Sequence, residues 1–238
     1  MSGSASQRPV ALVTGAARRI GAAIARRLHA SGHDIALHHH ASADEAQALV
    51  DELNTQRPGS AHAFGADLRE PDRIPELVAQ MVGHFGRLDA LVNNASAYFD
   101  TPFGTVTPAQ WDELFAINAR APFLLAQAAA PHLRAARGAI VNIGDLYAER
   151  PRADLVAYAA SKAALLGLTR GLAVALAPEV RVNAVSPGAI LWPEDGADTA
   201  RLIVVTHAAK EATLENIVSA LGELDEVKAV HSVIRLGS

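Results

Sequence analysis

Short hydrophobic runs typical of buried strands alternate with amphipathic helical runs along most of this chain. The strand-like runs cover residues 9–14, 34–39, 61–66, 90–93, 138–143 and 180–185. The helical runs cover residues 20–30, 42–56, 72–85 and 153–177, and another begins at Thr107 and continues past a break near Pro122. This alternation is typical of a parallel sheet whose connections cross over as helices. It predicts an α/β fold, a doubly wound parallel sheet with helices on both faces.

Composition narrows the class of protein further. The chain has 238 residues, 50% of them hydrophobic, and a net charge of −4. Disordered chains are less hydrophobic and more charged, and a protein that binds nucleic acid through phosphate contacts is usually basic. No cysteine is present, the first residues lack the apolar core of a signal peptide, and no apolar run reaches the ~20 residues that span a bilayer. We expect a soluble cytoplasmic protein, with neither nucleic acid nor a membrane as its partner.

The first strand-like run leads directly into a turn that carries two glycines. Gly15 and Gly21 lie in the stretch TGAARRIG, and a helix follows. Small residues at such a turn let backbone N–H groups approach a pyrophosphate at the helix N-terminus. Two glycines alone also fit an ordinary strand–helix turn, but their place in a βαβ unit favours a dinucleotide site.

A run of histidines, HHHAS at residues 38–42, follows the second strand-like run. Folds that bind NAD commonly place an acidic residue here for the ribose 2′-hydroxyl, and this chain has none. The imidazoles, Ser42 and the nearby Arg18 and Arg19 suit a 2′-phosphate better, which predicts NADP(H) as the coenzyme. A metal site and a solvated strand end are the alternatives. Because neighbouring side chains on a strand point to opposite faces, the three imidazoles do not suit one metal ion, and we predict no metal site.

The last long helical run contains Tyr158 and Lys162, whose spacing of four residues puts the phenol and the ammonium on one helix face. A free tyrosine has a pKa of about 10, and a neighbouring cation favours the phenolate and lowers that value. We therefore expect Lys162 to lower the pKa of Tyr158 and make it a usable general acid. The same spacing arises by chance in many helices, so the pair needs support from its context.

Six features in this order resemble the short-chain dehydrogenase/reductase family over roughly residues 8–194. They are the turn that ends at Gly21, Asp67, the NNA triplet at residues 93–95, Asn118, the pair Tyr158 and Lys162, and the SPG triplet at residues 186–188. The resemblance implies a Rossmann-type fold and NAD(P)(H). It also implies a catalytic group in which Asn118 orders a water of the proton relay and Lys162 holds the nicotinamide ribose besides assisting Tyr158. The coenzyme contacts it implies are Gly15, Arg18, Arg19, Ile20, Gly21, His39, His40, Ser42, Asp67, Leu68, Asn94, Ala95, Lys162, Pro187, Gly188 and Ile190.

Two departures from the general family pattern are similar to its pteridine reductase subgroup. Arg19 replaces the usual middle glycine of the turn, and Asp145 replaces the usual serine thirteen residues before the tyrosine. A carboxylate repels the charge that develops on a ketone oxygen, whereas Asp145 and Tyr158 together can relay a proton to the nitrogen of a C=N bond. The resemblance implies a pterin or folate substrate bound by Arg19, Ser96, Tyr98, Asp145 and Tyr158, with the Tyr98 ring stacked on the pterin.

The family pattern ends near Glu194, before the helices that usually cover the substrate and before the usual last strand. Residues 201–208 read as a strand, a helical run with an apolar face follows, and residues 227–236 read as another strand. This tail resembles the second half of the ACT domain of homoserine dehydrogenases. We therefore divide the chain into a reductase domain, residues 1–198, and an ACT-like half-module, residues 199–238.

Three functions remain open on this sequence. The first is NADPH-dependent reduction of a pterin, dihydropterin or dihydrofolate, with hydride from the nicotinamide and the proton through Tyr158 and Asp145. The second is a general ketone or alcohol oxidoreductase of the same family, which would reduce carbonyl substrates despite Asp145. The third is a catalytically silent NADP(H)-binding chimera, disabled by its tail. Alanine- and leucine-rich helical surfaces, together with the resemblance, predict a homodimer or homotetramer.

Overall fold

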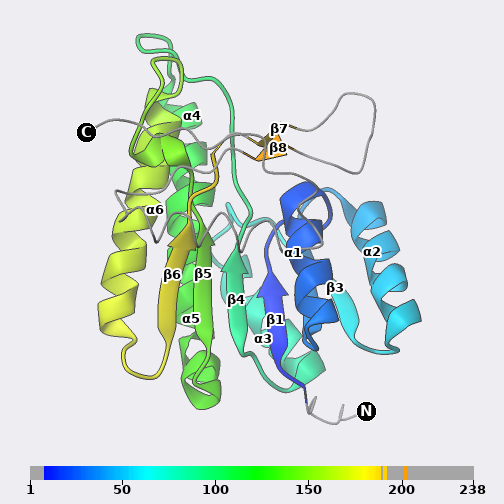
Figure 1. The fold of residues 1–238 in the computed structure, drawn as a ribbon. Helices are drawn as coiled ribbons and strands as arrows, with labels where there is room; N and C mark the ends of the chain where they lie inside the picture. Colours follow the sequence, from blue (N-terminus) through cyan, green and yellow to red (C-terminus); the bar gives the residue numbers. More distant parts are fainter. Residues whose placement is uncertain (1–7, 189, 192–200, 203–238) are drawn as a thin grey trace, which may run out of the picture.

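The structure is a computed structural model that describes residues 8–188, 190–191 and 201–202. Six strands form one parallel sheet in the order β3-β2-β1-β4-β5-β6 (Figure 1). Their bounds are β1 Val10–Val13, β2 Asp34–His39, β3 Ala61–Gly65, β4 Ala90–Asn93, β5 Ala139–Ile143 and β6 Arg181–Val185. The order reverses between β1 and β4, where an open α/β sheet binds its ligands. The predicted α/β fold is confirmed.

Helices cover both faces of this sheet (Figure 1). They are α1 Arg19–Ala30, α2 Ala43–Gln56, α3 Arg73–Phe85, α4 Pro108–Phe115, the π-helical turn η1 Ala116–Arg120, α5 Ala121–Ala136, the 3-10 turn η2 Leu146–Ala148 and α6 Val156–Ala175. None of these described helices is both long and apolar enough to cross a bilayer.

Alternate residues of β1 face the two helical layers. Val10 and Leu12 pack in the cluster that α3 and α5 complete, whereas Ala11 and Val13 pack in the cluster that α1 and α2 complete. This is the side-chain alternation of a strand, and all four side chains are fully buried. Burial on both faces fixes β1 at the centre of the sheet, so the turn that follows it lies at the switch point.

Two predicted helix boundaries differ from the structure. The helix predicted from residue 153 begins at Val156, and the break predicted near Pro122 lies before it, in η1. Pro122 has no N–H to donate to the carbonyl of Asn118, and the chain passes this point in the wider π-helical turn. Thr107 caps α4 through a capping box, as its position before Pro108 predicts.

The C-terminal region is described only in part. A two-residue strand, β7 Ile190–Leu191, pairs antiparallel with β8 Arg201–Leu202. The rest of the predicted tail, including most of the strand predicted at residues 201–208 and all of the later helix and strand, lies outside the described residues. The domain boundary after residue 198 therefore stays a prediction.

Candidate active site

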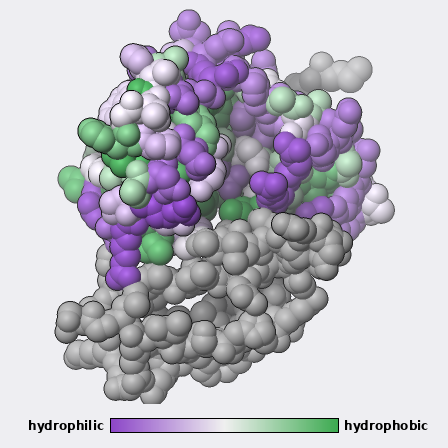
Figure 2. All heavy atoms as spheres, turned by 90° about the horizontal axis from the view of Figure 1, so that it is seen from above, coloured by the Kyte–Doolittle hydropathy of each residue, from purple (hydrophilic) through white to green (hydrophobic). Residues whose placement is uncertain are grey.

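The predicted site residues lie together along the carboxyl edge of the sheet. Residues 15–21 follow β1, His39, His40 and Ser42 end or follow β2, Asp67 and Leu68 follow β3, residues 94–98 follow β4, Asp145 follows β5, and Pro187 and Gly188 follow β6. Figure 2 looks down on this edge, whose described part carries interspersed hydrophilic and hydrophobic side chains. Asn118 in η1, Tyr158 and Lys162 on α6 and Ile190 in β7 complete the set.

Two positions of the turn between β1 and α1, Gly15 and Gly21, have no room for a larger side chain. Gly15 adopts a left-handed φ of 61°, and a Cβ there would lie 3.1 Å from the Ala95 Cα. A Cβ on Gly21 would lie 2.2 Å from the Gly15 carbonyl oxygen, which is a clash with backbone. At the start of α1, Arg18 provides no side-chain cap and the first turn has no acidic residue. Its backbone N–H groups therefore suit an anion such as a coenzyme diphosphate.

Asn94 and Ala95, predicted as coenzyme contacts, hold this turn in place. The Asn94 Nδ2 donates hydrogen bonds to the carbonyl oxygens of Thr14 at 2.9 Å and Gly15 at 3.1 Å. The backbone amides of Asn94 and Ala95 donate to the Thr14 Oγ1 at 2.9 and 3.0 Å. Thr14 thus joins β1 to the loop after β4, a role that its place in the glycine motif did not reveal.

The ends of β2 and β3 form the side of the site that suits an adenosine. The Nδ1 of His39 is buried and has no hydrogen-bond partner among the described residues. Ser42 occupies the N-cap of α2 without a side-chain cap bond, which leaves its hydroxyl available. The Nε2 of His40 lies 3.5 Å from Asp67, whose pKa is lowered to about 2, chiefly by hydrogen bonds from Arg69.

Leu68, predicted as a coenzyme contact, would reach a coenzyme only through its backbone. Its side chain is buried in the core cluster with α3. Only its backbone can therefore face a ligand at this edge. The assignment of this side to the adenosine half of the coenzyme stays a prediction.

Asp145, Tyr158 and Lys162 meet at the end of β5. The hydroxyl of Tyr158 donates a hydrogen bond to the Asp145 Oδ2 at 2.7 Å, and the Asp145 Oδ1 accepts one from the Tyr147 amide at 2.8 Å. The Nζ of Lys162 donates to the Ile143 carbonyl at 3.0 Å and lies 5.9 Å from the centroid of the Tyr158 ring. Tyr158 and Lys162 are both buried. The predicted catalytic side chains are therefore adjacent, and the phenol is directed at the carboxylate.

The predicted effect of Lys162 on Tyr158 is wrong for this arrangement. Burial, followed by the hydrogen bond to the Asp145 carboxylate, raises the pKa of Tyr158 instead of lowering it. Burial also lowers the pKa of Lys162 to about 8. A carboxylate that accepts the phenolic proton stabilises the neutral phenol. Tyr158 is therefore held as a protonated donor.

Asn118 connects the loop after β4 to α6. Its Nδ2 donates to the Ala97 carbonyl and to the Ser161 Oγ, both at 2.9 Å. Its Oδ1 accepts from the Ala97 amide at 2.9 Å and from the Ser96 Oγ at 3.0 Å. This side chain is fully engaged, so the implied ordering of a relay water by Asn118 would fall to its backbone and stays a prediction. The Ser161 Oγ donates to the Tyr158 carbonyl at 2.7 Å and completes the link, which the sequence did not indicate.

The predicted substrate residues leave an open aromatic surface beside the phenol. Tyr98 is 55% exposed, and its ring lies edge-on to that of Tyr158, with centroids 4.9 Å apart. Ser96 is exposed in the same loop, and Arg19 is exposed in the glycine turn. Arg19 has a left-handed φ of 51°, a conformation that favours glycine. Within the described residues no three His, Asp or Glu side chains converge where they could hold a metal ion.

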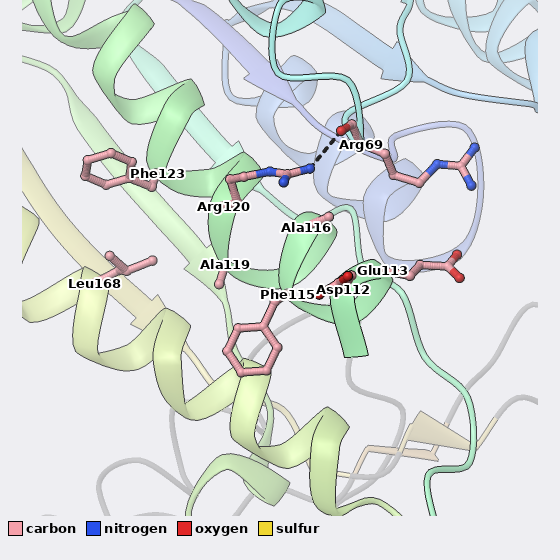
Figure 3. Close-up of a pocket in the computed structure, with 9 residues that line it drawn as sticks. All are labelled: Arg69, Asp112, Glu113, Phe115, Ala116, Ala119, Arg120, Phe123 and Leu168. Carbon is pink, nitrogen blue, oxygen red and sulfur yellow. Dashed lines mark hydrogen bonds between the residues drawn. The ribbon is translucent and has the colours of Figure 1, made fainter. Parts of the chain in front are cut away.

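Two grooves lie on another part of the molecule, along α4, η1, α5 and α6. The larger, about 710 Å³, contains Phe115, Arg120, Phe123 and Leu168, and the Arg120 Nη2 donates to the Arg69 carbonyl at 2.8 Å beside it (Figure 3). The smaller, about 560 Å³, is lined by residues of α5 and α6 that include Phe123, Gly167 and Gly171. Neither groove contains a predicted catalytic or coenzyme residue.

Comparisons with known proteins agree with this geometry. A family model described as short chain dehydrogenase matches residues 9–201. The chain is similar to pteridine reductase 1 of Leishmania tarentolae, with 38% identity over 79% of this chain and 78% of that protein. It is similar to the granaticin polyketide synthase putative ketoacyl reductase 2 of Streptomyces violaceoruber, with 36% identity over 81% and 77%. The 3-oxoacyl-[acyl-carrier-protein] reductase FabG of Staphylococcus aureus is 35% identical over 76% and 74%.

These relatives give no support to the predicted ACT-like tail, which stays a prediction. The family model covers most of the chain, from before β1 to β8. This chain belongs to the short chain dehydrogenase family and is an NAD(P)-dependent oxidoreductase.

Proposed function

We propose that this protein reduces a pterin, dihydropterin or dihydrofolate with NADPH. The observation that carries the proposal is the 2.7 Å hydrogen bond from the Tyr158 hydroxyl to the Asp145 carboxylate. A negative carboxylate beside the donor opposes the charge that a carbonyl oxygen develops, but it suits delivery of a proton to nitrogen. The 38% identity to a pteridine reductase supports the same choice.

The chemistry is the reduction of a C=N bond. A bound NADPH would supply the hydride, which adds to the carbon and breaks the π bond. The nitrogen then takes a proton from the phenol of Tyr158, and Asp145 steadies that phenol in its protonated form beforehand. The buried ammonium of Lys162, which donates to the Ile143 carbonyl, would hold the nicotinamide ribose. The backbone carbonyl of Asn118, which lacks an α-helical donor because residue 122 is proline, replaces its side chain as a place for a relay water.

Arg19 and Tyr98 supply the surfaces for a flat heterocycle. The left-handed backbone of Arg19 costs about 1 kcal/mol or more, a cost that a glycine at this position would not have. A side chain that is present despite this cost is a candidate for a functional role. It lies on the glycine turn, on the coenzyme side of the site. Tyr98 presents an exposed ring edge-on to Tyr158, on which a pterin would stack.

Reduction of a ketone, such as a 3-oxoacyl thioester, is the second candidate. The ketoacyl reductases, at 35% and 36% identity, are nearly as similar as the pteridine reductase. Asp145 argues against this candidate, because it already accepts the Tyr158 hydrogen bond that a carbonyl oxygen would need. Replacing Asp145 by serine would then favour the ketone.

The decisive experiment measures NADPH oxidation by the purified chain with dihydrobiopterin, dihydrofolate and an acetoacetyl thioester. We expect turnover of the pterin or folate only, and its loss in Asp145→Ser. Turnover of the thioester alone would establish the second candidate. Binding of NADPH without any turnover would leave the silent chimera.

We propose NADPH rather than NADH because basic groups and no acidic one end β2. One carboxylate does approach this place from α2, where Glu45 lies 3.4 Å from the Arg18 guanidinium. If Arg18 binds the 2′-phosphate, Glu45→Gln should tighten NADPH several-fold and leave NADH unchanged. Equal changes for both coenzymes would argue that Arg18 has no role in the choice. An NADPH-dependent reductase without cysteines also suits the reducing cytoplasm, where we place it.

We further propose that the chain forms a homo-oligomer through the grooves on α4, α5 and α6. Phe123 borders both grooves and is 40% exposed in the single chain. Exposed apolar surface of this kind is typical of an interface. Phe123→Glu should dissociate the assembly in light-scattering measurements. Val174→Glu, on α6 but 81% exposed and outside both grooves, should not.

A further inference from the structure

His38 has no role in the function described so far, although it is the most buried histidine of the HHHAS run. Its side chain is almost inaccessible at the end of β2, whereas His39 is partly exposed and His40 is exposed. The Gly15 amide donates a hydrogen bond to the His38 Nδ1 at 3.2 Å. The His38 Nε2 lies 3.0 Å from the Ala66 carbonyl oxygen. One imidazole thus links the glycine turn to the end of β3.

These two partners define the proton on the ring. The Gly15 N–H can only donate, so Nδ1 must be unprotonated, and the Ala66 carbonyl can only accept, so Nε2 must carry the hydrogen. The bridge therefore requires the neutral Nε2–H tautomer. Burial, the largest influence on this group, lowers the pKa of His38 to about 4, in keeping with a neutral ring.

The bridge holds the turn from the side opposite Asn94. The Ala16 amide donates to the His38 carbonyl at 2.9 Å, so both the backbone and the side chain of His38 hold the start of the turn. With the Gly15 and Ala16 amides engaged, the N–H groups at the start of α1 remain for phosphate. Ala66 precedes Asp67, on the adenosine side of the site.

We propose that His38 is a positioning residue for the coenzyme diphosphate: its imidazole fixes the Gly15 amide and so sets the path of the glycine turn. His38 touches no part of the coenzyme. It acts through the turn, and an acceptor at the Nδ1 position is the property that matters. The proposal extends the coenzyme site to a buried residue that is not among the predicted contacts.

Two variants, each of which keeps one of the two polar positions of the imidazole, separate this role from packing alone. The Oδ1 of His38→Asn lies where Nδ1 lies and can accept from Gly15. The amide of His38→Gln reaches the Nε2 position, keeps the donor to Ala66 and leaves Gly15 without an acceptor. Each variant is measured by calorimetry in the full chain with ADP, which reaches the turn through its diphosphate, and with 2′-AMP, which has no 5′-phosphate.

We expect His38→Gln to weaken ADP binding about tenfold and to leave 2′-AMP binding within twofold of the parent. His38→Asn should bind both probes within about threefold of the parent. Equal loss of ADP in both variants, parallel loss of 2′-AMP, or unchanged ADP binding in His38→Gln would each overturn the proposal. A parent chain that binds no ADP would remove the coenzyme assignment and this proposal with it.

A second measurement needs no substitution and stands if the variants fail to fold. Nitrogen-15 NMR of the imidazoles in the parent chain reports the tautomer of His38, and a coupling across the hydrogen bond joins its Nδ1 to the Gly15 nitrogen. We expect the neutral Nε2–H form at neutral pH, with that coupling. A protonated Nδ1 would contradict the bridge.

Discussion

The two halves of the candidate site are built in different ways. On the coenzyme side, a backbone turn that is crowded at Gly15 and Gly21 is held by bonds that Asn94 donates to Thr14 and by the bond that His38 accepts from Gly15. On the chemical side, the working atoms belong to long side chains of α6 and of the loop after β5, joined by the bond from Tyr158 to Asp145. The coenzyme half depends on glycines that carry no Cβ, and the chemical half depends on the functional groups of Tyr158 and Asp145. The coenzyme half should therefore fail through shape, and the chemical half through single functional groups.

The largest effect is expected from Tyr158→Phe, which removes one oxygen from the chemical half. Turnover should fall by about 10²–10⁴, the usual contribution of a general acid, while the affinity for NADPH stays the same. Steady-state rates and coenzyme binding are measured on the same preparation. Tyr98→Phe serves as the control, because it keeps the stacking ring and removes only an exposed hydroxyl. Equal losses in the two variants would contradict the distinct role of Tyr158.

A methyl group in the coenzyme half should be almost as damaging. Gly21→Ala places a Cβ against the Gly15 carbonyl, 2.2 Å away, and should lower the free energy of unfolding by about 1–3 kcal/mol besides abolishing coenzyme binding. Gly83→Ala is the matched control, since Gly83 is exposed in α3 and has nothing within 4 Å of a new Cβ. It should stabilise the chain by about 0.5–1 kcal/mol. Denaturant unfolding of both variants checks the contrast.

Arg19 lies on the glycine turn of the coenzyme half, but its proposed contact is with the substrate of the chemical half. It therefore tests whether the two halves act independently. Arg19→Gly relieves the left-handed φ of 51° and should raise the free energy of unfolding by about 1 kcal/mol. Turnover of dihydropterin should fall about tenfold or more, because a charged contact to the substrate is lost. A variant that gains stability and keeps full pterin turnover would remove Arg19 from the substrate site.

The last contrast between the two halves lies in the dependence of stability on pH. His38 and Lys162 are buried bases, with pKa values lowered to about 4 and about 8 from 6.5 and 10.5. Between its folded and unfolded pKa each group binds more protons in the unfolded chain, so stability rises with pH there. The rise should fall between about pH 4 and 6.5 for the coenzyme half, and between about pH 8 and 10.5 for the chemical half.

Urea unfolding across these windows tests each half by itself. The parent and His38→Asn should differ in slope only in the acidic window, and the parent and Lys162→Met only in the alkaline one. A variant that flattens neither window would show that its residue carries a normal pKa.

The parallel sheet and most element boundaries followed from the sequence, because alternating hydrophobic runs and a glycine turn are local signals. Strands β2 and β4 agree with their predicted bounds. The break assigned to Pro122 was displaced because a proline disturbs the turn before it, not its own position. The strand, helix and strand predicted for the C-terminal tail stay predictions.

The sequence by itself determined the parallel sheet and a site at its carboxyl edge, because periodicity marks the strands and helices, and the resemblance to a reductase family implied the residues that lie there. Only the tertiary structure decided what those residues do to one another. In the structure, the Tyr158 hydroxyl bonds to Asp145 and not to Lys162. The Asn118 side chain bonds to Ser161 and Ala97, and the His38 imidazole accepts a bond from the glycine turn. The physical reason is that pKa values and hydrogen-bond partners depend on burial and on distances of a few tenths of an ångström, which residue spacing does not encode.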